Sequence, residues 1–281
     1  MTTEGVEGVD QHIRHVAAAL GLSIIGPFAH GTFGAVAVVT ADGLELVLKA
    51  QPDPALEPVW ATGAEMAARL HERGYPNPRI LRVGSTGAAV WSLQERLAGE
   101  VLTRLTLTQA VQLITLAGRH DIDSGLCRPW REDAIAAARG WLESAPIDPT
   151  HAWVLAAAID RGEGAEILQT TIVHGDFHHG NALVDGDEVT GVLDWEIAGP
   201  GDWRFDLVML AFGCHIRPGS CEPAASALLT EAVRSRCPDD VAALMMACQV
   251  LRQTSMIAAR SPGSAAKACG RMVSALDDWL R

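Results

Sequence analysis

The chain has 281 residues, which is enough for one large domain or for two lobes that share a cleft. Hydrophobic residues make up 48% and charged residues 20%, a balance typical of a folded globular protein and not of a disordered one. The formal net charge of -12 argues against binding to a nucleic-acid backbone or to an anionic membrane surface. It is compatible with a cationic small molecule as partner, although acidity that serves only solubility explains the charge more simply.

The N-terminus and the cysteines both favour a cytoplasmic location. Residues 1–7 are polar and acidic, without a basic or an apolar segment, so we expect no secretory signal. No apolar run stands out as long enough to span a membrane. The six cysteines are scattered and form no Cys-x-x-Cys pair, a pattern that predicts reduced thiols and not a disulfide framework or a zinc ribbon.

The first ninety or so residues predict a sheet with two helices. Residues 10–20 are expected to form a helix that stops at Gly21. Residues 62–73 predict a second helix, placed after the third of five strands. The β-rich runs predict a mostly antiparallel sheet with strands at 22–28, 35–40, 45–50, 80–83 and 88–93.

The remainder of the chain is predominantly helical. The apolar spacing predicts helices at 109–118, 132–144, 151–160, 224–235, 239–259 and 264–281. A β interlude interrupts them at 171–174, 182–184 and 189–193. We therefore expect an α+β protein with a small β-rich lobe followed by a larger helical lobe.

Three polar residues form the constellation with the clearest chemistry. Asp176 and Asn181 are five positions apart, and Asp194 follows 13 positions later, beyond the predicted hairpin. A strand–loop–strand–turn–strand arrangement can bring the three side chains to one end of that hairpin. Phosphoryl transfer needs such a set: one carboxylate accepts the proton of the attacking hydroxyl, while a second carboxylate and an amide oxygen hold Mg²⁺.

The stretch His174-Gly175-Asp176, with Asn181 and then Asp194-Trp195, resembles the aminoglycoside phosphotransferase family of antibiotic kinases, which are relatives of protein kinases. The resemblance covers nearly the whole chain and is strongest over residues 171–213. It implies a protein-kinase-like two-lobe fold, with an N-terminal nucleotide-binding lobe at 1–94, a hinge at 95–99 and a helical C-terminal lobe at 100–281. One departure is His179, which stands where the family often has proline.

The resemblance also implies roles for these residues. Asp176 would be the catalytic base and would contact the substrate hydroxyl, and Asn181 and Asp194 would be the magnesium ligands. His178 falls where protein kinases have a lysine, so it could contact the γ-phosphate, or it could simply pack beside the loop. The implied cofactors are ATP (or GTP) and Mg²⁺.

The first lobe supplies the expected nucleotide contacts. Lys49 ends the third predicted strand, where the kinase fold places the lysine that binds the α- and β-phosphates, and Glu65 on the next helix is its expected ion-pair partner. Backbone groups of Glu95 and Leu97 would bind the adenine edge. A turn of five residues could cover the phosphates, although a simple hairpin turn fits equally well; beyond His30 it comprises Gly31, Thr32, Phe33 and Gly34.

The expected substrate is a cationic antibiotic, and Glu196 and Asp202 are the leading candidates for acidic contacts with it. Further candidates are Glu231, Asp277 and Asp278, and a surface or structural role is the simpler interpretation of each of these carboxylates. The family resemblance suggests a cyclic peptide antibiotic such as capreomycin or viomycin, or an aminoglycoside, inactivated by phosphorylation of a hydroxyl. A metabolite kinase of the choline, homoserine or methylthioribose type is the alternative. The protein is expected to be a monomer or a homodimer.

Two other classes compete with a kinase. His174, Asp176, His178 and His179 could form a zinc cluster, but their order does not match a hydrolase motif and further ligands are not evident. A catalytically inactive nucleotide-binding module would be expected to lack the lysine, the base or a metal ligand, and this chain has all of them.

Overall fold

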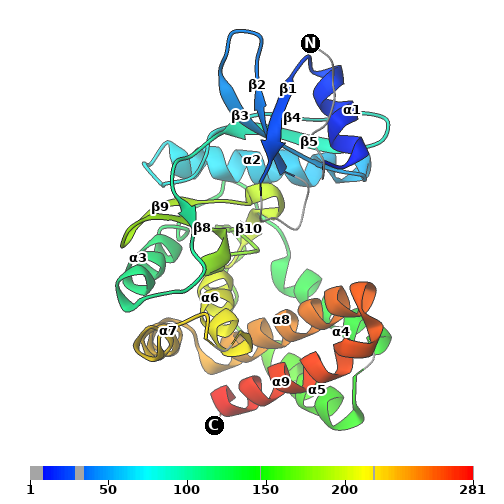
Figure 1. Cartoon of the computed structure of the whole chain (residues 1–281). Coiled ribbons are helices and arrows are strands. Elements are labelled where there is room, and N and C mark those ends of the chain that lie inside the picture. The colour runs from blue at the N-terminus through cyan, green and yellow to red at the C-terminus, as the bar shows by residue number, and fades with distance from the viewer. Residues whose placement is uncertain (1–8, 29–34, 146, 218, 281) are drawn as a thin grey trace. The chain divides into compact units, whose positions relative to one another are not determined.

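The computed structural model describes residues 9–28, 35–145, 147–217 and 219–280. The chain folds into two compact units (Figure 1). Unit 1 comprises Met1–Glu100, Leu183–Asp185 and Thr190–Gly199, and unit 2 comprises Val101–Ala182, Gly186–Val189 and Pro200–Arg281. Unit 1 carries an antiparallel sheet and unit 2 is mainly helical, so the predicted α+β class is confirmed.

The sheet of unit 1 has five strands in the order β1-β2-β3-β5-β4, and each neighbouring pair is antiparallel, as expected. The helix α1, Gln11–Ala19, buries Ile13 and Val16 against the apolar side chains of β2 and β3. Each such buried side chain contributes about 1.5–3 kcal/mol. The strands are β1 (Ser23–Pro27), β2 (Ala35–Val39), β3 (Glu45–Gln51), β4 (Ile80–Ser85) and β5 (Val90–Glu95).

The second helix of unit 1, α2, spans Glu57–His71 and begins five residues before the predicted start at 62. A short 3₁₀ turn, Pro54–Leu56, precedes it, and Pro58 stands in its first turn, where a proline costs no hydrogen bond. Gly63 lets α2 approach the 3₁₀ turn η3, Trp195–Ile197, because a Cβ at this position would lie 2.2 Å from the carbonyl oxygen of Trp195. The same contact fixes the turn that follows Asp194.

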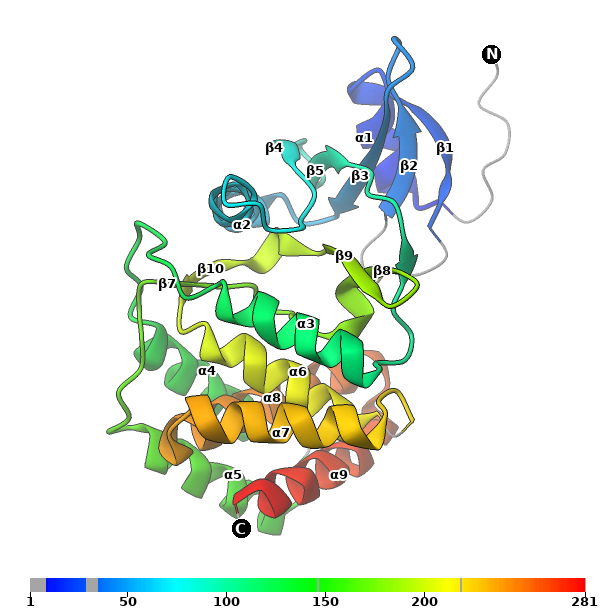
Figure 2. The ribbon, with the colours of Figure 1, turned by 90° about the vertical axis from the view of Figure 1, so that its left-hand side faces the viewer.

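Unit 2 is built around buried helices. Figure 2 shows α3, α6 and α7 side by side. By length and composition, one described helix, Asp239–Ala259, could cross a membrane, and 67% of it is buried in the protein. The helices are α3 (Leu107–Gly118), α4 (Trp130–Ser144), α5 (Pro149–Gly162), α6 (Arg204–Ile216), α7 (Pro223–Arg236), α8 (Asp239–Arg260) and α9 (Pro262–Leu280).

Helix α6 was not among the predicted helices. Its run from Leu207 to Phe212 is buried throughout, so the helix has no polar face and no period of 3.6 residues that would reveal it.

Short strands frame the loop that carries Asp176. The strand β7, Thr171–Val173, pairs with β10, Gly199–Gly201, and leads directly into that loop. The 3₁₀ turn η2, His179–Asn181, ends the loop. Three further strands form a small sheet in the order β6-β8-β9: Glu100–Val101, Ala182–Asp185 and Glu188–Val192.

Candidate active site

A buried carboxylate anchors the start of the loop in unit 2. Asp206 on α6 has no exposed surface, and it accepts hydrogen bonds from the backbone N–H groups of His174 (2.7 Å) and Gly175 (3.0 Å). Nδ1 of His120 lies 2.9 Å from the same carboxylate. Gly175 has a φ of +81°, which only glycine adopts without strain. These contacts fix the direction in which the chain leaves β7.

Asn181 closes the loop around Asp176. The Asn181 Nδ2 group donates to the backbone carbonyl of Asp176 at 2.9 Å and to its carboxylate at 3.2 Å. Because the amide nitrogen is used in this way, the amide oxygen is left to act as a ligand for a cation. The Asp176 side chain keeps 35% of its surface exposed, so a substrate hydroxyl can reach it.

Arg252 on α8 binds the same loop with both ends of its guanidinium group. Its Nη1 donates to the carbonyl oxygen of Gly175 at 2.9 Å, and its Nη2 donates to the Asp176 carboxylate at 3.0 Å. Burial alone would raise the pKa of Asp176. The nearby His178, Arg252 and His174 have a larger and opposite effect, so the pKa lies well below the usual carboxyl range. Asp176 is therefore ionised at neutral pH.

Unit 1 holds a second charged cluster, centred on Lys49. The lysine lies on β3 between β2 and β5 and is 6% exposed. Its Nζ is 2.5 Å from a carboxylate oxygen of Asp194 and 2.8 Å from one of Glu196. Burial lowers the pKa of Lys49, but the two carboxylates outweigh burial and hold it above the ordinary value. The lysine is thus a fixed positive charge inside unit 1.

Asp194 has an unusual backbone. Its φ of 66° is the one left-handed conformation of a non-glycine residue in the described part of the chain. Such a conformation is strained and concentrates at functional sites. The next residue holds it in place: Trp195 is buried, its ring meets the Tyr75 ring edge-on at 5.5 Å, and its Nε1 donates to the Val192 carbonyl at 2.9 Å.

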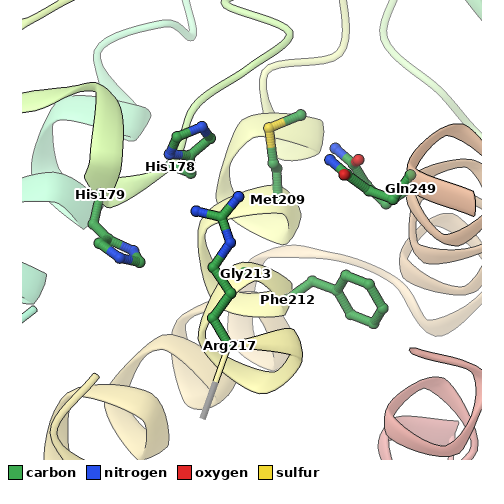
Figure 3. A pocket seen from close by; sticks show the side chains of 8 residues that line it. His178, His179, Met209, Phe212, Gly213, Arg217 and Gln249 are labelled. Carbon is green, nitrogen blue, oxygen red and sulfur yellow. The ribbon is translucent and has the colours of Figure 1, made fainter. Parts of the chain in front are cut away.

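A pocket opens beside the loop within unit 2 (Figure 3). The loop contributes His178 and His179, and the Arg217 guanidinium at the end of α6 points toward them. The other lining residues are Met209, Phe212 and Gly213 of α6 with Gln249 and Gln253 of α8. Met209 also lies within 3.9 Å of Arg252, so the pocket adjoins the ion pair of the base.

The sequence profile of the phosphotransferase enzyme family matches residues 25–238, more than half of the chain. The chain belongs to this family. The resemblance found in its motifs is therefore confirmed.

Among curated proteins, this phosphotransferase is similar to homoserine kinase of Pseudomonas aeruginosa. The two are 28% identical over 204 residues, which cover 62% of this chain and 60% of the relative. The match therefore spans less than two thirds of the relative's length.

Solved structures share the fold. The aminoglycoside phosphotransferase APH(4)-Ia, in a ternary complex with ADP and hygromycin B, has a TM-score of 0.66 at 18% identity and covers 95% of this chain and 98% of its own. A macrolide 2'-phosphotransferase from Brachybacterium faecium has a TM-score of 0.60 at 18% identity, with coverages of 95% and 97%. An amicoumacin kinase with AMP-PNP and Ca²⁺ has 0.65 at 14% identity, with coverages of 96% and 93%.

The expected partner of Lys49 in the phosphotransferase differs from the one found. Glu65 is exposed on α2 and pairs with Arg69 one turn later, at 2.8 Å. Glu196 of η3, the turn that α2 approaches at Gly63, reaches the lysine directly. The expectation of a Lys49–Glu65 pair is therefore wrong for this structure, and Glu196 takes that place.

The two residues expected to bind a cationic substrate are both used elsewhere. Asp202 is completely buried, holds the Arg204 guanidinium at 2.6 Å and accepts from the backbone N–H of Leu168 at 3.0 Å. Glu196 is 8% exposed beside Lys49. Neither carboxylate is presented to a substrate, because each is neutralised by a basic side chain of its own unit.

The remaining nucleotide contacts stay predictions. The phosphate-covering turn, Gly31, Thr32, Phe33 and Gly34, lies outside the described residues. The backbone N–H of Glu95 donates to the Arg79 carbonyl at 3.0 Å. Leu97 follows it and packs against Gly191. Nε2 of His178 lies 3.6 Å from the Asp176 carboxylate, beside the base.

Sequence reasoning missed Arg252 and the anchoring pair of Asp206 and His120. Arg252 is 76 positions from Asp176, and nothing in its helix marks it as functional. Asp206 lies within residues 171–213, where the family resemblance is strongest, and this was a usable signal for a structural role. The zinc interpretation finds no support, because the described residues contain no group of three or more His, Cys, Asp or Glu side chains suited to a metal ion.

Proposed function

We propose that the phosphotransferase transfers the γ-phosphoryl group of ATP to a hydroxyl of a small molecule, with Asp176 as the general base. The observation that carries this proposal is an ionised, partly exposed carboxylate in a loop that Asp206, Asn181 and Arg252 hold in place. Asp176 takes the hydroxyl proton, the hydroxyl oxygen bonds to the γ-phosphorus, and the bond to the bridging oxygen breaks to release ADP.

Lys49 is proposed to bind the phosphates of the nucleotide. A buried ammonium that two carboxylates keep charged is suited to this role, because it is positioned in advance and cannot lose its proton at neutral pH. Glu196 orients it from η3. With Asp194 as a metal ligand, Glu196 would be the carboxylate that keeps Lys49 in place for the phosphates.

Asn181 and Asp194 are proposed to hold the magnesium ion. Their donor atoms, an amide oxygen and a carboxylate oxygen, are the hard oxygen ligands that Mg²⁺ prefers. The Nδ2 of Asn181 is committed to the loop, which leaves its oxygen available, and the Asp194 side chain is 36% exposed. The ion would supply charge neutralisation at the phosphates.

The acceptor is proposed to be an antibiotic hydroxyl, so that phosphorylation confers resistance. Support comes from fold neighbours solved with hygromycin B and amicoumacin. The second candidate is a metabolite hydroxyl, which the similarity to homoserine kinase favours. ATP is the proposed donor, since these neighbours contain ADP or AMP-PNP.

The test is ADP release by purified protein with Mg²⁺ and a panel of aminoglycosides, macrolides, cyclic peptide antibiotics and metabolite alcohols. An acceptor should stimulate release, and Asp176→Ala should lower the stimulated rate by about a hundredfold or more, as loss of a general base does. Stimulation that survives Asp176→Ala would overturn the mechanism. If antibiotics leave the rate unchanged while a metabolite alcohol raises it, the resistance role fails and the metabolite role stands.

A further inference from the structure

Four buried polar atoms without a hydrogen-bond partner among the described residues gather around the pocket beside the loop. They are Nδ1 of His178, Nδ1 of His179, Nε2 of Gln249 and Nε of Arg252. His178, His179 and Gln249 line the pocket, and Arg252 lies one turn from Gln249 on α8. Buried polar groups without partners are costly, and several in one place indicate a site that a polar ligand completes.

The charge of the pocket argues against a cationic ligand. None of its eight lining residues, all within the described chain, carries a carboxylate. Arg217 is a permanent cation whose guanidinium points inward (Figure 3). The lining is therefore neutral to positive.

The nearest carboxylate does not change this balance. Asp176 adjoins the pocket through His178, but Arg252 binds it at 3.0 Å. A protonated amine entering here would meet Arg217 without a free anionic partner among the lining residues. A ligand with acceptor oxygens would instead meet the Arg217 guanidinium, the Gln249 amide and the imidazole nitrogens.

We propose that this pocket binds the acceptor substrate through a carboxylate, held by Arg217 and Gln249 close to the hydroxyl that Asp176 deprotonates. The acceptor is then a hydroxy carboxylic acid, a class that includes hydroxy amino acids, and not a polycation. This proposal rests on the proposed phosphotransfer function and, of the two candidate acceptors proposed above, favours the metabolite hydroxyl over a polycationic antibiotic.

The first test compares acceptors that differ only at the carboxyl group. ADP release is measured with 4-hydroxy-2-aminobutanoate, its carboxamide and 3-aminopropan-1-ol, and with a wider set of short hydroxy acids and their amides. Aminoglycosides form the cationic arm. The expected result is that a hydroxy acid has a kcat/KM at least about tenfold above that of its amide, the loss typical when a charge-assisted hydrogen bond is removed.

The second test removes the cation. Arg217 is exposed at the end of α6, so Arg217→Gln is expected to fold. It should raise KM for the hydroxy acid by about tenfold to a hundredfold and leave KM for the amide nearly unchanged. Arg271→Gln, which removes an exposed arginine of α9, is the matched control and should change neither value. Gln249→Leu should also raise KM for the acid and thus tests the buried amide separately.

The outcomes distinguish failure of the carboxylate-binding pocket from failure of the proposed phosphotransfer function. If an aminoglycoside or an amine alcohol outperforms every hydroxy acid while Asp176→Ala still abolishes turnover, the kinase stands and the carboxylate pocket is wrong. Equal effects of Arg217→Gln on the acid and on its amide would also overturn it. If no acceptor of any class stimulates ADP release, the proposed phosphotransfer itself fails.

Discussion

At the scale of single residues, Lys49 forms ion pairs with carboxylates other than the one expected from the sequence. The lysine is buried on a central strand, a position that demands a negative partner, because an unpaired ammonium in the interior is strongly disfavoured. The family resemblance pointed to Glu65, on the helix after the strand, as that partner. The structure uses Asp194 and Glu196 instead, both from the turn that Gly63 allows α2 to approach.

Variants of Glu196 and Glu65 test which of the two carboxylates orients Lys49. Glu196→Gln should raise KM for ATP about tenfold, since Lys49 loses a carboxylate that orients it, and tenfold corresponds to about 1.4 kcal/mol. Glu65→Gln, which removes an exposed carboxylate paired only with Arg69, should leave KM within about twofold. Steady-state kinetics with varied ATP checks both variants. The reverse pattern, a large effect of Glu65→Gln, would restore the partner expected from the sequence.

Arg252 is the second residue whose role can be tested, because its guanidinium group binds both the proposed base, Asp176, and the backbone carbonyl of Gly175. Arg252→Met should lower kcat by about tenfold to a hundredfold, since the carboxylate loses a charged donor that positions it. Arg252→Lys keeps the charge but not the two-pronged geometry and should recover only part of the rate. A thermal melt by circular dichroism separates positioning from unfolding. A Met variant that is folded and fully active would contradict this role.

At the scale of elements, sequence patterns predicted the sheet of unit 1 well. Its strands are short apolar runs bounded by turn residues, so their positions follow from local sequence. Helix α6 was not predicted because burial on all sides removes the 3.6-residue period of apolar side chains from its sequence. This helix supplies Asp206 and the pocket residue Met209, and the pocket residue Arg217 follows its end. The candidate catalytic motif could be predicted from its spacing and its family resemblance, whereas the residues that support it come from helices distant in sequence and could not be inferred from local pattern.

The contact between α2 and η3 allows a test by one methyl group. Gly63→Ala should destabilise the protein by about 1–3 kcal/mol, because its Cβ would lie 2.2 Å from a backbone oxygen that cannot move without shifting the turn. Gly140→Ala is the control: this exposed glycine of α4 has nothing within 4 Å of a new Cβ, so the variant should be stabilised by about 0.5–1 kcal/mol. Urea unfolding measures both. Equal effects would show that the close approach does not govern stability.

At the scale of the whole molecule, the net charge of -12 does not by itself identify the acceptor. Overall charge acts on solubility and long-range attraction, whereas binding depends on the few groups that line a site. Asp202 and Glu196 illustrate the difference, since both are acidic and both are neutralised inside the fold by Arg204 and Lys49. Composition could not show this, because each pairing depends on which segments the fold brings together.

The proposed magnesium site can be tested through the thermal stability of the whole protein. AMP-PNP with Mg²⁺ at a hundred times its dissociation constant should stabilise the folded chain by about 2.7 kcal/mol, which raises Tm by roughly 5–10 °C. Chelation with EDTA should remove most of that shift, since the phosphates then lose the ion that Asn181 and Asp194 are proposed to hold. Asp194→Asn should show little response to Mg²⁺. Asp160→Asn, an exposed carboxylate beside Arg139, should respond like the unaltered protein. A nucleotide shift that is the same with and without Mg²⁺ would contradict the proposed ligands, and a shift lost in Asp160→Asn would show that the response reflects general charge and not the site.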